Sequence, residues 1–277
     1  MKKSVKHQPF IKEMFLRFHR DEVLNLSAEL AYFLLLSLFP FLIFMFTLIA
    51  FLPFQGDDLL ALVRQFAPEE SLYLIEHNVQ NVLSKQNTSL LSFGAIATVW
   101  SASNGINAII RALNRAYNVK ETRSFLIARA IAILLTIAMI FVIVIALLLP
   151  VFGKAIGVYF FSSFGASEEF LDVWNMLRWI VSIAILFIVF TFLYLFAPSK
   201  RLRLSQVVPG AIFTTVGWSF SSLAFSYYVN NFSNYSAMYG SLGGVIVLMI
   251  WLYLSGIILV LGGEVNGIYQ ERIEVED

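Results

Sequence analysis

The sequence predicts an all-α membrane protein: a bundle of six transmembrane helices with an interfacial N-terminal helix and an amphipathic extracytoplasmic helical hairpin. Three observations indicate this fold class. Hydrophobic residues make up 59% of the 277-residue chain and charged residues only 13%, well below the roughly 25% charged residues of an ordinary soluble domain. Six apolar stretches approach the length of about 20 residues that a helix needs to span a bilayer. The basic residues gather in alternate connecting segments, a pattern typical of multi-pass membrane proteins.

The six spans are expected within a single integral membrane domain that covers residues 1–277. Turn-forming or charged residues separate the apolar stretches, as at 118–123 and 198–201. We place the spans near residues 30–53, 89–110, 125–150, 174–197, 207–229 and 241–265.

The distribution of lysine and arginine predicts the orientation. If the N-terminus is cytoplasmic, most basic residues lie in the segments 2–20, 111–129 and 200–203 on the cytoplasmic side, while the opposite side keeps only Arg64, Lys85 and Lys154. Loops rich in these residues stay in the cytoplasm. We therefore expect both termini to be cytoplasmic.

Two further segments are predicted to be helical without spanning the membrane. In the N-terminal segment, apolar residues recur at three- and four-residue spacing from Phe10 to Phe18, with Lys12, Arg17 and Arg20 on the other side. This pattern favours a helix lying in the inner interface of the membrane. The segment 57–87 shows two amphipathic helical turns broken at Pro68, which predicts an outer hairpin, either packed on the bundle or binding a partner.

The second predicted span is unusually polar. Small residues recur on one face from Thr98 to Ala108, which allows another helix to approach closely, and Asn104 and Asn107 lie beside that face. An amide needs a partner in hydrocarbon, so this helix is expected to be central in the bundle. The two amides fit either bundle packing or contact with a substrate.

Ionisable and amide side chains fall near the cytoplasmic ends of three predicted helices. Carboxylates are costly to bury unless paired, and arginines are their obvious partners. We predict an inner polar cluster that closes the cytoplasmic end of a cavity; the alternative is that these groups are solvated at headgroup level. The candidate residues are Glu29, Arg111, Asn114, Arg115, Glu264 and Asn266.

A second set of residues is expected to line a cavity or to serve packing. Pro40 should weaken the first span, the fifth span carries a stripe of hydroxyl side chains, and tyrosines gather in an outer loop. These candidates are Tyr32, Pro40, Asn104, Asn107, Thr214, Ser222, Tyr239, Gly240 and Gly244.

Two GxxxG spacings in the last span predict close helix contacts. One is formed by Gly240 and Gly244 at the outer end, and the other by Gly263 and Gly267 around Glu264. We expect a backbone or an arginine of the second span to come near the Glu264 carboxylate.

The residue types give little support for an enzyme or for a cofactor-binding protein. The chain has no cysteine and three histidines that do not cluster, so thiolate metal sites are excluded and no catalytic, cofactor or metal residue is assigned. No phosphate-binding glycine loop or hydrolase motif is present. The basic residues are explained by topology, and no nucleic-acid partner is expected.

Four motifs occur together in this chain. They are ELAYFLLLSLFP at 29–40, SASNGINAIIRALNRAY at 101–117, VVPGAIFTTVGWSFSSLAFSYYV at 207–229 and YGSLGGVIVLMIWLYLSGIILVLGGEVN at 239–266. Together they resemble the YihY/BrkB family of bacterial inner-membrane proteins, once labelled ribonuclease BN. The resemblance implies six transmembrane helices with cytoplasmic termini, and a role as a transporter or flippase of a lipid or amphiphilic solute in contact with membrane lipids. A non-transporting scaffold or partner of an envelope complex is the alternative, ribonuclease activity is not expected, and oligomerisation is left open.

Overall fold

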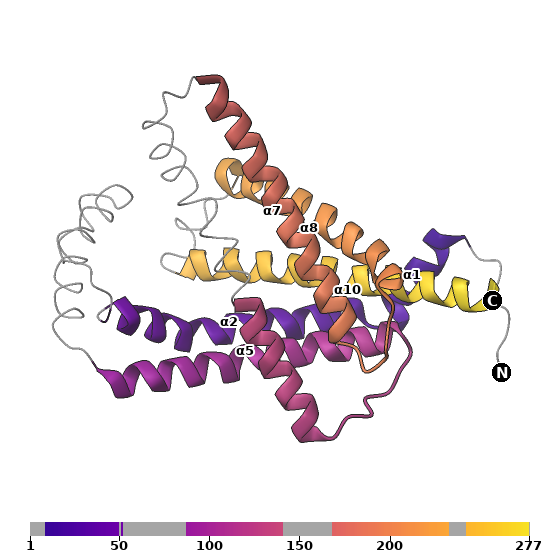
Figure 1. Ribbon diagram of the computed structural model, residues 1–277, viewed down its shortest axis with the longest axis horizontal. Coiled ribbons are helices and arrows are strands. Elements are labelled where there is room, and N and C mark those ends of the chain that lie inside the picture. The colour runs from indigo at the N-terminus through magenta and orange to yellow at the C-terminus, as the bar shows by residue number, and fades with distance from the viewer. Residues whose placement is uncertain (1–8, 50, 52–86, 141–167, 233–241, 277) are drawn as a thin grey trace. The chain divides into compact units, whose positions relative to one another are not determined.

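The described part of the chain is helical throughout. A computed structural model describes residues 9–49, 51, 87–140, 168–232 and 242–276, and these residues contain no strand (Figure 1). The helices are α1 (Phe10–Arg20), α2 (Val23–Ile49), α5 (Thr88–Ala116), an apolar helix at Phe125–Ile140, α7 (Glu168–Phe196), α8 (Leu204–Phe232) and α10 (Gly243–Glu276).

The chain forms two compact units. Unit 1 comprises residues 1–32 and 103–277, and unit 2 comprises residues 33–102. In unit 2, α2 and α5 approach closely at Gly94, where an added Cβ would lie 3.0 Å from the Phe44 Cα. Pro40 lies inside α2 without ending it.

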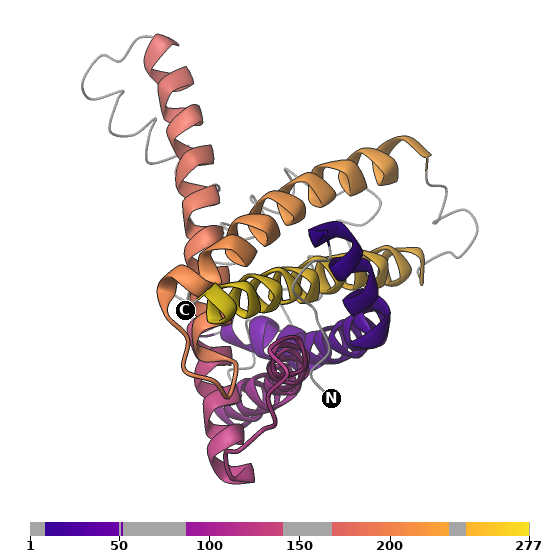
Figure 2. The same cartoon turned by 90° about the vertical axis from the view of Figure 1, so that its right-hand side faces the viewer.

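In unit 1, α10 is the central helix. It packs against α8, which packs in turn against α7, while α1 contacts α10 (Figures 1 and 2). All residues from Gly262 to Ile268 are buried, so this part of α10 is covered on every side. A helix that is buried all round must accommodate polar side chains through neighbours rather than through water.

Four described helices are long and apolar enough to cross a membrane. They are Val23–Phe44, Trp179–Phe196, Leu204–Val229 and Gly243–Ile273. The helix Phe125–Ile140 is apolar but shorter, and the rest of the predicted span 125–150 lies outside the described residues. Helix α5 covers the predicted span 89–110, but its polar residues make it less apolar than the four helices that could cross a membrane. The total of six spans therefore stays a prediction.

Several helices extend past their predicted ends. Helix α10 continues to Glu276 rather than ending near residue 265, and α2 begins at Val23 rather than near residue 30. Helix α5 continues to Ala116, where Asn118 adopts a positive φ of 51° and the Val119 N–H donates to the Asn114 carbonyl over 2.9 Å. This is a left-handed C-terminal cap.

The N-terminal helix is confirmed as a helix, but one of its faces was misassigned. Phe10, Ile11 and Phe15 are exposed on the outside of the protein, as an interfacial helix requires. The sequence predicts Arg17 on the solvated side of the helix, but the residue is buried, with 2% of its surface exposed. The charged face of α1 packs on the protein and leaves the apolar face uncovered.

The predicted outer hairpin at 57–87 lies outside the described residues, except for its last residue. Tyr239 and Gly240 also lie outside the described residues, as do the three outer basic residues Arg64, Lys85 and Lys154.

Candidate functional site

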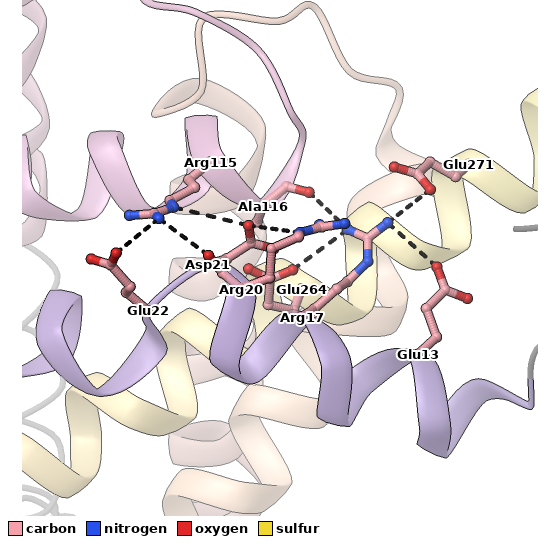
Figure 3. A network of polar contacts seen from close by, with 9 residues as sticks. All are labelled: Glu13, Arg17, Arg20, Asp21, Glu22, Arg115, Ala116, Glu264 and Glu271. Atoms are coloured by element: carbon pink, nitrogen blue, oxygen red, sulfur yellow. Dashed lines mark hydrogen bonds and ion pairs between the residues drawn. The ribbon is translucent and has the colours of Figure 1, made fainter. Parts of the chain in front are cut away.

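Arg17 is the centre of a buried network at the C-terminal end of α10 (Figure 3). Its guanidinium donates to the Ala116 carbonyl at the end of α5 over 3.0 Å. It also forms ion pairs with Glu271 at 2.8 Å, Glu13 at 3.4 Å and Glu264 at 3.5 Å. One side chain of α1 thereby links α1, α5 and α10. We call Glu13, Arg17, Glu264, Glu271 and Arg272 the Arg17 cluster, because Arg272 also pairs with Glu13 at 3.4 Å.

The sequence of α1 explains why this network is buried. Glu13, Arg17 and Asp21 recur every four residues, so they lie along one face of the helix, and all three are buried. Asp21 follows α1 and accepts two hydrogen bonds from Arg20, the shorter being 2.8 Å. Buried charges are tolerated when they are paired and hydrogen-bonded.

Glycines of α10 bring its neighbours close to Glu264. A Cβ added at Gly267 would collide with the Ala116 carbonyl oxygen and lie 3.0 Å from the Arg17 guanidinium, and one at Gly263 would lie 2.5 Å from Leu113. The predicted close approach of the α5 backbone at this spacing is therefore confirmed. The arginine beside Glu264, however, comes from α1 and not from α5, because α1 folds back along the end of α10.

Asn266 and Tyr194 hold α10 against α8 and α7. The Asn266 side-chain oxygen accepts a hydrogen bond from the Gly210 N–H at 2.6 Å. The Tyr194 hydroxyl donates to the Leu259 carbonyl at 2.7 Å and lies 2.5 Å from the Thr214 hydroxyl. Three helices are thus joined by polar contacts of the buried side chains Asn266, Tyr194 and Thr214.

Arg111 and Arg115 take other partners. Arg111 forms an ion pair with Glu29, with both side chains at least one third exposed. Arg115 pairs with Glu22 at 3.3 Å and donates to the Arg20 carbonyl at 3.2 Å. The hydrogen bond and charge of Arg115 lower the pKa of Glu22. Neither arginine is paired with Glu264.

Hydrogen bonds join the end of α5 and the loop after it to the end of α7 and the turn between α7 and α8. Asn114 accepts from the Ser199 N–H at 2.7 Å and donates to Glu121 at 3.0 Å. Arg123 donates to Glu121 at 2.8 Å, to Ser199 at 2.8 Å and to the Ala197 carbonyl at 2.9 Å. Burial acts to raise the pKa of Glu121, but hydrogen bonds from Arg123 and Ser199 outweigh it and lower that pKa to about 2.

Unit 1 has a pocket of about 650 Å³ that is lined by residues from the end of α1, the end of α5, the loop after α5 and α10. Four basic and three acidic side chains line it together with two asparagine amides, so both signs of charge face the same space. The lining residues are Arg20, Asp21, Arg111, Asn114, Arg115, Asn118, Val119, Lys120, Glu121 and Glu271.

Some buried polar atoms near this end of α10 have no hydrogen-bond partner. They include the Glu264 Oε1, the Asn266 Nδ2 and the Tyr117 hydroxyl. Burial raises the pKa of Tyr117; the nearby Asn266 amide acts against this and a charged Glu264 adds to it. Tyr117 is therefore close enough to sense both residues, although no hydrogen bond of ordinary geometry joins them.

The predicted inner polar residues are gathered at one end of unit 1, but in separate groups. Glu264 belongs to the Arg17 cluster, Asn266 binds α8, and Arg111, Asn114 and Arg115 line the pocket. Sequence reasoning missed Glu13, Arg17 and Glu271. The four-residue spacing of charges on α1 was the available signal, and it was interpreted as a solvated face.

The predicted cavity and packing residues are scattered. Thr214 is buried against Tyr194, Asn104 accepts from Arg129 at 2.7 Å, and Asn107 and Ser222 are half-buried. Tyr32 is exposed, and Pro40 belongs to unit 2. Around Gly244 no described atom lies within 4 Å of an added Cβ.

The described residues offer no candidate metal site. Within the described ranges, no group of three or more histidine, cysteine, aspartate or glutamate side chains could hold a metal ion.

Comparisons with known proteins match almost the whole chain. The family described as Virulence factor BrkB matches residues 14–277. A ribonuclease-like protein, YfkH, of Bacillus subtilis (strain 168) is 55% identical over 97% of this chain and 98% of its own length. A UPF0761 membrane protein of Aeromonas salmonicida (strain A449) is 31% identical over 96% of this chain and 92% of its own. No solved structure matches the chain.

Proposed function

Because the chain belongs to the BrkB family of membrane proteins, we propose that it moves a lipid or another amphiphilic solute across the bacterial inner membrane. The family is a membrane-protein family and not a known enzyme family, which favours transport or assembly over catalysis. In this proposal both termini are cytoplasmic, as the basic segments predict, and the pocket opens toward the cytoplasm.

The pocket of about 650 Å³ is the observation that carries the proposal. Lipid headgroups combine a phosphate with amines, hydroxyls or sugars, and a lining of both charge signs with amides can bind such mixed groups. Among its cations, Lys120 is exposed and forms no ion pair with a described residue. Arg115 is 40% exposed at the side chain, so it can also reach a ligand.

Helices of unit 1 provide the apolar part of the proposed path. Helices α7, α8 and α10 expose large apolar side chains along their lengths, as membrane-crossing helices do. A lipid bound by its headgroup would keep its acyl chains against such a surface, so that these chains stay out of water while the headgroup crosses. The Arg17 cluster beside the pocket would act as the inner gate of an alternating-access cycle.

Reconstitution tests transport directly. The purified chain is placed in vesicles that contain a phospholipid with a fluorescent headgroup, and an impermeant reductant bleaches the label on the outer leaflet. Transport predicts that the bleached fraction rises above one half, while vesicles with an unrelated membrane protein stay near one half. A folded chain that leaves the fraction near one half, with or without an ion gradient, would contradict the proposal.

A scaffold role is the second candidate, and the solid packing around Gly262 favours it. Glycine contacts and buried hydrogen bonds join α7, α8 and α10 there, and such contacts hold a bundle rigid. The two roles differ in the same vesicle experiment, because a scaffold moves no lipid.

A further inference from the structure

The Arg17 cluster contains one carboxylate that the described cations do not balance. Arg17 pairs with Glu271 at 2.8 Å, and Glu13 is shared between Arg17 and Arg272 at 3.4 Å each. These two arginines and two glutamates are electrically neutral together. Glu264 is the third carboxylate, so its ionised form would leave the cluster with an excess negative charge.

The contacts of Glu264 are also poor for an ionised group. Its side chain is 0% exposed, and among the described residues its only contact with a cation is the 3.5 Å approach of Oε2 to Arg17. Oε1 has no hydrogen-bond partner among the described residues. An ionised carboxylate out of water normally accepts two or three hydrogen bonds, and without them the neutral acid is favoured.

The other described charged groups that act on Glu264 supply no surplus positive charge. Arg20 and Asp21, which act on Glu264 from the end of α1, form an ion pair with each other at 2.8 Å. Arg115 is paired with Glu22 at 3.3 Å. Tyr117, directly after α5, is close enough to Glu264 to be influenced by its charge, and its hydroxyl is neutral and has no hydrogen-bond partner among the described residues.

We propose that Glu264 is a proton-binding site, neutral in the structure described here, which exchanges its proton with water at the pocket. Release leaves a carboxylate that competes with Glu13 and Glu271 for Arg17. Since Arg17 also holds the Ala116 carbonyl, the exchange changes the link between α1, α5 and α10. The site does not depend on lipid transport; in a transporter it makes the proton the coupling ion.

Infrared spectroscopy of the purified chain in lipid nanodiscs tests this site. Buried neutral carboxylic acids absorb separately from carboxylates, so the wild type should show a carboxylic-acid band at neutral pH that disappears at high pH. The band should be lost in Glu264→Gln and kept in Glu271→Gln, because Glu271 is 43% exposed at the side chain and ion-paired.

Two results would overturn the proposal. One is the absence of a carboxylic-acid band in the wild type at neutral pH, which would mean that Glu264 is ionised and satisfied by water. The other is a band that persists in Glu264→Gln. If Glu264→Gln does not fold, glutamate labelled with ¹³C in the wild type must shift the band, and an unshifted band excludes a glutamate.

Discussion

At the residue scale, one buried arginine organises the end of the molecule. Arg17 is the only described side chain that contacts α1, the end of α5 and two glutamates of α10 together. Such a charge contributes through the groups that would be left unpaired without it, since buried ions are costly to desolvate. The importance of Arg17 therefore lies in its pairing with Glu13 and Glu271 and in its hydrogen bond to the Ala116 carbonyl.

Replacing Arg17 tests this role. Arg17→Gln leaves the buried Glu13 with Arg272 as its remaining described cation and removes the donor of the Ala116 carbonyl. We expect it to lower the free energy of unfolding by about 3 kcal/mol. Arg203→Gln is the matched control, because Arg203 is exposed and should change stability by less than about 1 kcal/mol. Thermal unfolding in detergent measures both. Equal effects of the two substitutions would contradict a structural role for Arg17.

Glu121 gives the protein an acid-sensitive contact. Its pKa is about 2 in the folded protein against an ordinary value of 4.5, so its contribution to stability is fully present above pH 4.5 and is lost as the pH falls toward about 2. Thermal unfolding measured over this range should show a steeper acid loss for the wild type than for Glu121→Gln, which has no proton to gain. Identical acid profiles would exclude this contribution.

The identity of the partners of Glu264 could not be predicted from residue types. The GxxxG spacing correctly predicted close contacts at Gly263 and Gly267, but the arginines expected beside Glu264 were those of α5, which pair with Glu22 and Glu29 instead. The sequence could not show that α1 turns back on α10, because the two-residue turn at Asp21 and Glu22, where Glu22 has a positive φ of 55°, sets that direction. The sequence therefore predicts an arginine of α5 beside Glu264, and the structure has Arg17 of α1 at this position.

At the scale of elements, hydropathy located the helices but not their ends. The polar residues after 265 lowered the apolar signal, so the last span was predicted to end there. The helix continues to Glu276 because Asn266, Gln270 and Glu271 find buried or paired positions against neighbouring helices. Tertiary packing, which a sequence window does not contain, keeps this polar segment helical.

Glycine positions test the packing of α10 against its neighbours. A Cβ at Gly262 would collide with the Thr214 hydroxyl and the Tyr194 hydroxyl, so Gly262→Ala should destabilise the protein by about 1 to 3 kcal/mol. Gly244→Ala is the matched control: the added methyl meets open space among the described residues and alanine favours the helix, with a gain of about 0.5 to 1 kcal/mol. Comparable losses in both variants would refute the close packing at Gly262.

At the scale of the whole molecule, composition predicted an all-helical membrane protein, and the described residues agree. Four spans satisfy length and hydropathy, whereas the polar α5 and the segment past Ile140 keep the number of six a prediction. The orientation rests on the basic segments alone.

Cysteine labelling tests the orientation. The chain has no cysteine, so a single introduced thiol is the only reactive one. Ser124→Cys, after α5, should be protected from an impermeant maleimide in intact cells, and Ser89→Cys, at the start of α5, should be labelled; both positions are exposed. The reverse pattern would invert the proposed topology and place the pocket on the outer side.

We propose that an amphiphile passes through the pocket that Arg115 and Lys120 line. The most direct test compares the rate of lipid movement in vesicles for two double variants that remove the same charge: Arg115→Gln with Lys120→Gln in the pocket, and Arg203→Gln with Lys12→Gln outside it. We expect the pocket variant to be at least about tenfold slower, equivalent to about 1.4 kcal/mol, and the outer variant to match the wild type. Equal rates for a folded pocket variant and the wild type would contradict the claim.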